Sequence, residues 1–481
     1  MGTGRKMVWV SILMSVAPLV SRGRVADGQE ESQELKKKVE EQEKRIAELE
    51  KKLGAAPSAP EPAPPPAPAG EAEGKKGFLE FIRWNEVSVG SSRFKLYGFL
   101  RLDAIYDDSR PNNTQVIGFV RSEDPGALKQ FAANPGAFGG VDPRKFVSPD
   151  DSETLTIHPR LTRFGLDFDG PTVVPFNHSK VTGKLEIDFY NNSLQPQSES
   201  RAAIRMRHAY LKLAWPHLSL LFGQTNDVIS PLFPVVNPDL VMWGAGNLGD
   251  RRPQARAEYL HRLGPGDILL QGEAGLTGAD DNQDLDAPNT VGAGFRDGEA
   301  SGLPTLQSRI AYRYPLTEKN PLEVGIYGHR AWEQTDTRLG GKNHFDSWAY
   351  GFDVFLPLYR NLLFLKGEGW RGANVDDVRG GIFQGINTVT GDEIFSQGGW
   401  AELGWQAFPR WLISIGYSTD DPDNQDVGLG GRAQNRIAYL SNRWVFAPIE
   451  IGFDYLYWVT EYVGFNNGDD NRFQAYIAYR F

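Results

Sequence analysis

Residues 180–190 read KVTGKLEIDFY, and this stretch predicts the fold class. Val181, Leu185 and Ile187 fall on every second position, with charged or polar residues between them. Successive side chains of a β-strand point to opposite faces of its sheet, so this strand would have one apolar face and one charged face. The alternation recurs through residues 94–481 and predicts an all-β domain over that range.

Sixteen segments carry this alternation. An even number of antiparallel strands brings both ends of a closed sheet to the same side of a membrane, as in single-chain outer-membrane barrels. Tight turns alternate with longer loops, and the longer ones include 227–251, 334–344 and 461–470. We expect strands at 94–106, 155–169, 179–190, 204–215, 218–226, 252–263, 267–277, 304–314, 322–333, 345–357, 362–371, 399–408, 411–420, 432–445, 449–460 and 471–481.

The composition fits a membrane barrel better than a helical membrane protein. Aromatic residues make up 12% of the 481 residues, yet the mean hydropathy is −0.42. No later segment approaches the ~20 consecutive apolar residues that a membrane-spanning helix needs. In hydrocarbon every backbone N–H and C=O needs an internal partner, which a closed sheet supplies. The expected fold is a 16-stranded antiparallel transmembrane β-barrel in the outer membrane of a diderm bacterium.

The first 26 residues are typical of a signal peptide. Arg5 and Lys6 precede an apolar stretch, Met7 to Val20, that is too short and too interrupted for a membrane-spanning helix. We therefore expect residues 1–26 to direct export, and the region that follows them to lie in the periplasm.

Residues 33–53 predict a coiled coil, because apolar residues recur there at spacings of four and three. A solvated single helix is the alternative, and the seam does not fix the number of chains. Seven prolines between Pro57 and Pro68 make 54–77 an extended linker. Residues 78–84 (FLEFIRW) could form an interfacial element or a plug. The seam consists of Leu35, Val39, Gln42, Ile46, Leu49 and Leu53.

The final strand, NRFQAYIAYRF, places alternate aromatic and apolar residues on one face and ends in Phe481. Such an ending resembles the signal by which outer-membrane proteins are delivered to the barrel-assembly machinery. We take Phe473, Tyr479 and Phe481 as that signal.

The loop 227–251 is long, apolar and rich in proline and glycine. We expect it to fold into the barrel and narrow the lumen, although packing on a neighbouring subunit is the alternative. Its candidate constriction residues are Ser230, Pro231, Phe233, Pro234 and Trp243.

Arginine side chains on the polar faces of the strands are the candidate selectivity residues. Guanidinium groups in a narrow pore attract anions and bind carboxylates in a bidentate manner. Carboxylates such as Asp103 and Glu258 share these faces, however, and would offset part of that attraction. The expected pore-lining set is Arg101, Arg163, Arg252, Gln254, Arg256, Arg309 and Arg313.

Four short motifs follow one another along the predicted barrel: LYGFLRLD at 96–103, RMRHAYL at 205–211, LFGQT at 221–225 and RRPQAR at 251–256. Taken in order, they resemble the DcaP-like porins and, more distantly, the phosphate-selective porins. The resemblance covers most of 94–481, and a coiled coil before the barrel is also a feature of the family. It implies a sixteen-stranded homotrimer that passes small solutes, often organic anions. Asn226 stands where the family usually has tryptophan.

The expected function is passive diffusion of small hydrophilic solutes, with a preference for organic anions such as carboxylates. The alternatives are a non-selective, phosphate or sugar porin, and a structural tether that links a barrel anchor to the cell wall and its peptidoglycan. The expected partners are outer-membrane lipid and small anionic or polar solutes.

Other function classes fit the sequence poorly. The net charge of −10 and the lack of a basic block argue against nucleic-acid binding. The seven histidines are scattered, there is no cysteine nucleophile, and no cofactor or metal is expected, so an enzyme is disfavoured. The acidic segment 279–286 lacks the spacing of a defined calcium site and is expected to be a solvated loop.

Overall fold

The computed structural model describes residues 79–83, 85–123, 152–189, 203–236, 241–278, 297–317, 320–359 and 362–481. The chain divides into two units, Met1–Lys75 and Lys76–Phe481, and all described residues belong to the second. The predicted signal peptide, coiled coil and Pro-rich linker (up to residue 77) lie outside the described residues and stay predictions.

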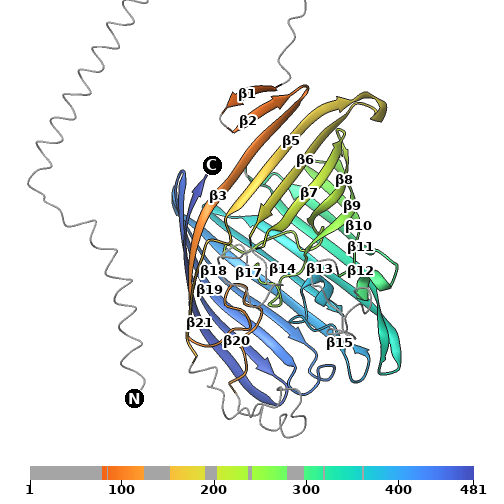
Figure 1. The fold of residues 1–481 in the computed structure, drawn as a ribbon, viewed down its shortest axis with the longest axis vertical. Helices are drawn as coiled ribbons and strands as arrows, with labels where there is room; N and C mark the ends of the chain where they lie inside the picture. Colours follow the sequence, from red (N-terminus) through yellow and green to blue (C-terminus); the bar gives the residue numbers. More distant parts are fainter. Residues whose placement is uncertain are drawn as a thin grey trace, which may run out of the picture. The chain divides into compact units, whose positions relative to one another are not determined.

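Sixteen strands form a closed wall, because the last strand pairs with the first (Figure 1). Each neighbouring pair is antiparallel, so backbone N–H and C=O groups along the wall bond within the sheet, as a membrane interior requires. The predicted 16-stranded barrel is confirmed. The strands are β3 (Ser92–Asp107), β5 (Arg163–Val173), β6 (Ser179–Asp188), β7 (Arg205–Ala214), β8 (Leu218–Asn226), β9 (Arg251–Leu263), β10 (Gly266–Gly275), β11 (Thr305–Tyr314), β12 (Leu322–Leu339), β13 (Lys342–Pro357), β14 (Leu363–Ala373), β17 (Phe395–Phe408), β18 (Trp411–Pro422), β19 (Arg432–Phe446), β20 (Ile449–Tyr462) and β21 (Phe465–Arg480).

The two faces of the wall differ as the alternating sequence predicts. Leu102 is 49% exposed and Phe352 54% exposed on the outer face. Their neighbours Asp103 and Asp353, on the inner face, are almost completely buried. Soluble proteins have the opposite arrangement, with apolar side chains inside. The outer surface of the wall therefore suits hydrocarbon and its inner surface suits water and polar groups.

The predicted strand 155–169 is wrong as a single strand. It is divided into β4 (Thr154–His158), which pairs with one half of β3, and β5, which pairs with the other half. Pro159 follows β4 and has no backbone N–H to donate to the ladder. The Thr162 N–H instead bonds to the Pro159 carbonyl at 2.9 Å, and its hydroxyl accepts the Arg101 N–H at 3.0 Å.

The predictions of long loops at 334–344 and 461–470 are also wrong, because the strands beside them continue to tight hairpins. β12 and β13 meet at Gly340 and Gly341, whose φ values are +55° and +91°. Residues with side chains rarely adopt this left-handed backbone, which two-residue hairpins that match the strand twist require. β20 and β21 meet in the same way around Gly464.

Residues 79–89 extend the wall at the end with the short turns. β1 (Leu79–Arg83) pairs with β2 (Glu86–Val89), and β2 pairs with the start of β3 (Figure 1). Phe481 lies at the same end, where its backbone exchanges two hydrogen bonds with Gly98. The predicted segment 78–84, interfacial element or plug, thus contains β1, and both alternatives stay predictions.

Three of the connections at the other end fold inward and pack on the inner wall. The Asn435 side chain on β19 donates to the carbonyl of Gly118 in one connection and of Gly244 in another, at 2.7 and 2.6 Å. Residues 374–394, with η8 (Asp376–Val378), β15 (Ile386–Asn387) and β16 (Asp392–Glu393), form the third. Apolar contacts among them form two clusters inside the barrel. The described residues also contain the helical turns η5 (Val174–Phe176) and α4 (Asp297–Ala300).

Among the described residues, no helix is long and apolar enough to cross a membrane.

Candidate functional site

The inner strap, defined here as residues 227–236 and 241–250, leaves the end of β8 and returns at the start of β9. Its carbonyl groups reach β14 and β18: Trp370 Nε1 donates to the Gly246 carbonyl at 2.8 Å, and the Ser418 hydroxyl donates to the Ala245 carbonyl. β18 lies half of the circumference away from β8 in the strand order. The strap therefore crosses the lumen from one wall to the opposite one.

Apolar side chains near both ends of the strap hold it against the wall. Val228, Ile229 and Leu248 are each 2% exposed or less, and they cluster with Tyr327 and Trp370 on the inner wall. Burial of these groups explains why an apolar loop is found inside a polar lumen.

Arg252 joins the root of the strap to the second inward loop. Its guanidinium binds both carboxylate oxygens of Asp227 at 2.8 and 3.1 Å, and Asp377 of η8 at 3.1 Å. The same group donates to the carbonyls of Leu276 and Asp377. The side chain is 1% exposed. Arg252 was expected to line the lumen, but it is enclosed by carboxylates and has almost no surface for a passing anion.

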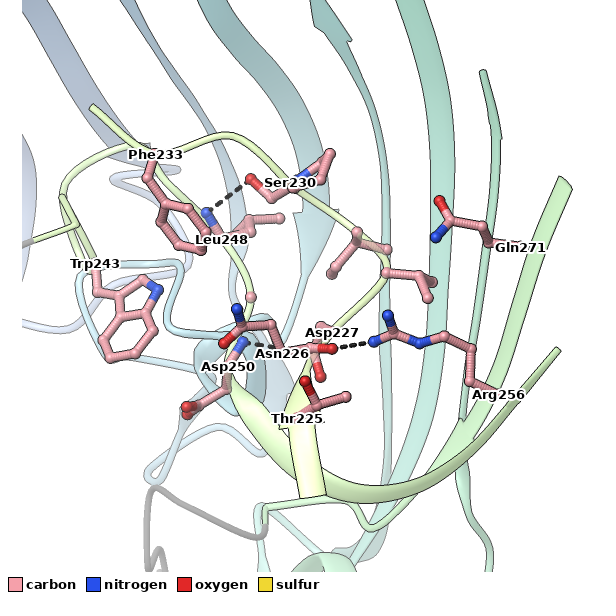
Figure 2. Close-up of a pocket in the computed structure, with 14 residues that line it drawn as sticks. Thr225, Asn226, Asp227, Ser230, Phe233, Trp243, Leu248, Asp250, Arg256 and Gln271 are labelled. Carbon is pink, nitrogen blue, oxygen red and sulfur yellow. Dashed lines mark hydrogen bonds between the residues drawn. The ribbon is translucent and has the colours of Figure 1, made fainter. Parts of the chain in front are cut away.

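Arg256, four residues after Arg252 on β9, lies beside a cavity of about 210 Å³ between the strap and the wall. Figure 2 shows its guanidinium pointing toward Asn226, whose carbonyl it binds. Arg256 Nε donates to Gln254 at 2.9 Å, and Gln254 in turn donates to the Thr225 carbonyl at 3.1 Å. The Arg256 side chain is 11% exposed, so it retains a polar surface at this cavity.

The opposite side of the cavity is aromatic. Trp243 and Phe233 line it from the strap, facing Arg256 and Gln271 on the wall (Figure 2). The Trp243 ring has the guanidinium groups of Arg251 and Arg379 at 5.5 and 5.4 Å from its centre. Its Nε1 has no hydrogen-bond acceptor among the described residues. Among the residues that line this cavity, the positively charged group is the Arg256 guanidinium, which also lies 3.4 Å from Glu273.

The other predicted constriction residues lie on the strap close by. Pro231 lines the same cavity, and Pro234 is buried. Ser230 is 3% exposed, and its hydroxyl contacts the Asn247 side chain at 2.7 Å.

The remaining predicted arginines are paired with carboxylates on the inner wall. Arg101 binds Asp103 at 2.6 Å and stacks over Tyr476, and Arg309 binds Asp353 at 2.5 Å. Both side chains are 3% exposed or less, so they differ from the expectation of a lumen-facing surface. Arg163 and Arg313 keep 16% and 39% of their surface while lying 3.6 and 2.7 Å from Glu186 and Glu323.

Comparisons with known proteins give the fold but no sequence family. No family model matches the sequence, and no curated protein is significantly similar to it. The outer membrane channel DcaP of Acinetobacter baumannii matches with a TM-score of 0.60 at 18% identity, over 81% of this chain and 98% of that chain. The barrel has the fold of a DcaP-like porin. The resemblance drawn from the sequence motifs is confirmed for the fold.

Two further structures are weaker matches to this DcaP-like barrel. The anion-selective porin from Comamonas acidovorans is 11% identical with a TM-score of 0.47, over 81% of this chain and all of that chain (100%). Salmonella typhi OmpF in complex with daunomycin is 13% identical with a TM-score of 0.48, over 81% of this chain and 98% of that chain.

One cluster of arginines and carboxylates in the DcaP-like barrel was not predicted from the sequence, because it depends on a β-bulge. The register between β6 and β7 shifts after Glu186, so that both Arg205 and Arg207 reach inner-face carboxylates. Arg207 binds Glu186 at 2.7 Å, and Arg205 binds Asp188 at 2.6 Å. In the sequence, one extra residue in a strand shows only as an interruption of the polar–apolar alternation. The alternation resumes at His208.

Within the described parts of the chain, no group of three or more His, Cys, Asp or Glu side chains is arranged to hold a metal ion.

Proposed function

We propose that this protein is an outer-membrane porin that lets small hydrophilic solutes diffuse passively, with a preference for organic anions such as carboxylates. The observation that carries the proposal is the closed wall with an apolar outer face and a charged inner face, crossed by the inner strap. A sheet of sixteen strands encloses more space than its own side chains fill. The strap would then narrow that space and set which solutes pass.

The anion preference would come from inner-wall guanidinium groups that keep exposed surface. Arg256 near Glu273, Arg163 near Glu186 and Arg313 near Glu323 are such groups. Arg101, Arg252 and Arg309 are enclosed. The proposal therefore assigns selectivity to a smaller set of arginines than the sequence did.

Replacing Arg256 with Ala should lower the anion-to-cation permeability ratio by about fourfold. A unit charge about 10 Å from a passing ion contributes about 0.4 kcal/mol in water. The charge favours an anion and disfavours a cation by that amount, so the ratio changes by about 0.8 kcal/mol, which is about fourfold. The ratio is read from the reversal potential across a planar bilayer under a salt gradient. Arg262→Ala on the same strand is the control, because Arg262 is 66% exposed and lies toward the turn. An unchanged ratio in Arg256→Ala would show that this guanidinium does not act on passing ions.

We also propose a homotrimer in the outer membrane, with the end that carries the short turns, β1 and Phe481 facing the periplasm. The fold similarity to DcaP supports the proposed location in the outer membrane, and the predicted coiled coil supports the proposed oligomer. The rings of Tyr479 and Phe473 lie on the outer face of β21, on the same side as the 49%-exposed Ile477, where the assembly machinery could bind them.

Swelling of liposomes tests the channel function directly. Liposomes that contain the full-length protein should swell in isosmotic solutions of small sugars and carboxylates, at rates that fall steeply with solute size. If the folded protein is inserted and swelling stays at the level of empty liposomes, the porin proposal fails and the tether, with a filled lumen, is the better account.

A further inference from the structure

Two glutamates on the far wall hold the inner strap through its backbone. Glu368 on β14 accepts a hydrogen bond from the Leu232 N–H at 2.7 Å and one from the Ser230 hydroxyl. Glu402 on β17 accepts one from the Val235 N–H at 2.6 Å. The two glutamates are 4% and 1% exposed. Four consecutive strap residues, 232–235, are thus bound at both ends by buried carboxylates.

Two carbonyl groups of the same segment, those of Phe233 and Val235, are bound by cations of the wall. Lys366 Nζ donates to the Phe233 carbonyl at 2.5 Å and lies 3.3 Å from Glu402. Arg443 donates to the Val235 carbonyl at 2.6 Å and is itself held by Asp454 at 2.6 Å. Donors and acceptors of the strap backbone are therefore both matched by charged partners, which form stronger hydrogen bonds than neutral groups.

Another inner-wall carboxylate, Asp353, binds an arginine of the wall and no residue of the strap. Asp353 on β13 is completely buried and binds Arg309 in a bidentate manner at 2.5 and 2.8 Å. Among the described residues no arginine pairs with Glu368, and besides the strap it accepts a hydrogen bond from Trp400 Nε1 at 3.3 Å. A buried carboxylate without adequate hydrogen bonds is costly, so a displaced strap would leave Glu368 in an unfavourable state.

We infer that Glu368 and Glu402 are positioning residues that keep the middle of the strap on the far wall and thereby set the cross-section of the pore. This inference rests on the proposed porin function. Neither glutamate needs to contact the solute: each acts through the backbone of residues 232–235. These contacts to the backbone amides of Leu232 and Val235 act together with the buried apolar side chains of the strap.

A cysteine reporter makes the docking measurable without any current. The chain has no cysteine, so Ser441→Cys introduces a single thiol. Ser441 has no exposed surface and lies on the inner face of β19 between Tyr439, which binds Glu402 at 3.1 Å, and Arg443. A water-soluble thiol reagent should label this position slowly while the strap is docked.

In that background of the full-length protein, replacing Glu368 and Glu402 with Gln should accelerate labelling by at least about tenfold. Each hydrogen bond to a charged group contributes enough to change a docking equilibrium by about that factor. The same double substitution, without the reporter, should raise the single-channel conductance and its fluctuations. Asp353→Asn is the matched control, since it neutralises a buried inner-wall carboxylate that binds no strap residue, and it should change neither readout.

Leu232→Pro tests the same contact from the strap and serves if the double variant does not fold. Proline removes the N–H that Glu368 accepts and leaves the wall unchanged. Unchanged labelling in both the Gln and the Pro variants, or equal acceleration in Asp353→Asn, would overturn the inference. Faster labelling with unchanged conductance would overturn its statement about the pore cross-section. A wild-type protein that conducts nothing would refute the porin proposal instead, and the labelling would still report on the docking.

Discussion

Replacing Arg252 with Met should destabilise the folded barrel by about 3–5 kcal/mol, the range found when one member of a buried ion pair is removed. Asp227 at the start of the strap and Asp377 of η8 are both buried, and both would lose the guanidinium that they share. Because Arg252 also binds the carbonyls of Leu276 and Asp377, the two inward loops would lose their common attachment. Urea unfolding of the protein in lipid vesicles or detergent micelles measures this change.

The control is Arg262→Met on the same strand, whose pair with Asp267 is exposed and should contribute less than about 1 kcal/mol. The anion-to-cation permeability of the Arg252 variant should change little wherever it still folds, since the side chain is enclosed. Near-wild-type stability together with a large loss of anion preference would show that Arg252 faces the lumen, contrary to the structure.

Placing a charge on the outer face of the wall should have the second large effect. Phe352→Arg, near the middle of β13, should destabilise the barrel in a bilayer by about 2–4 kcal/mol, the cost of an arginine at the centre of the hydrocarbon. Phe352 is 54% exposed on the outer face, so the loss of internal packing is small. Unfolding in vesicles of defined thickness measures the change.

Leu429→Arg provides the comparison, because Leu429 is 72% exposed in the connection between β18 and β19 and lies outside the strands. It should alter stability by less than about 0.5 kcal/mol, as for most surface substitutions. If both arginines were tolerated equally, the outer face of β13 would not lie in hydrocarbon.

The strands of the barrel could be predicted from the sequence because their signal is local. Alternation such as that of 180–190 arises because the two faces of one strand meet different surroundings. Each of the sixteen predicted segments overlaps a strand of the wall, and 155–169 is divided in two. Where the prediction failed, single residues explain the difference: Pro159 interrupts a ladder, and Gly340 with Gly341 allows a hairpin in place of a loop.

The site was harder to predict because its contacts are distant in the sequence. The sequence showed that Arg252 shares a face with charged residues, but not that Asp377, from another connection, covers it. Leu456 and Trp458 lie on the inner face of β20, where the alternation predicts polar residues. Such apolar residues at inward positions mark where a loop packs inside the barrel, and they are the signal that could have located the inward loops.

A single-channel recording of the purified full-length protein in a planar bilayer tests the central claim, a water-filled barrel narrowed by the strap. The account predicts discrete conductance steps that are proportional to voltage and that exclude large solutes. The account is contradicted if the protein is inserted and folded, as judged by the change of its electrophoretic mobility on heating, and still passes no measurable current.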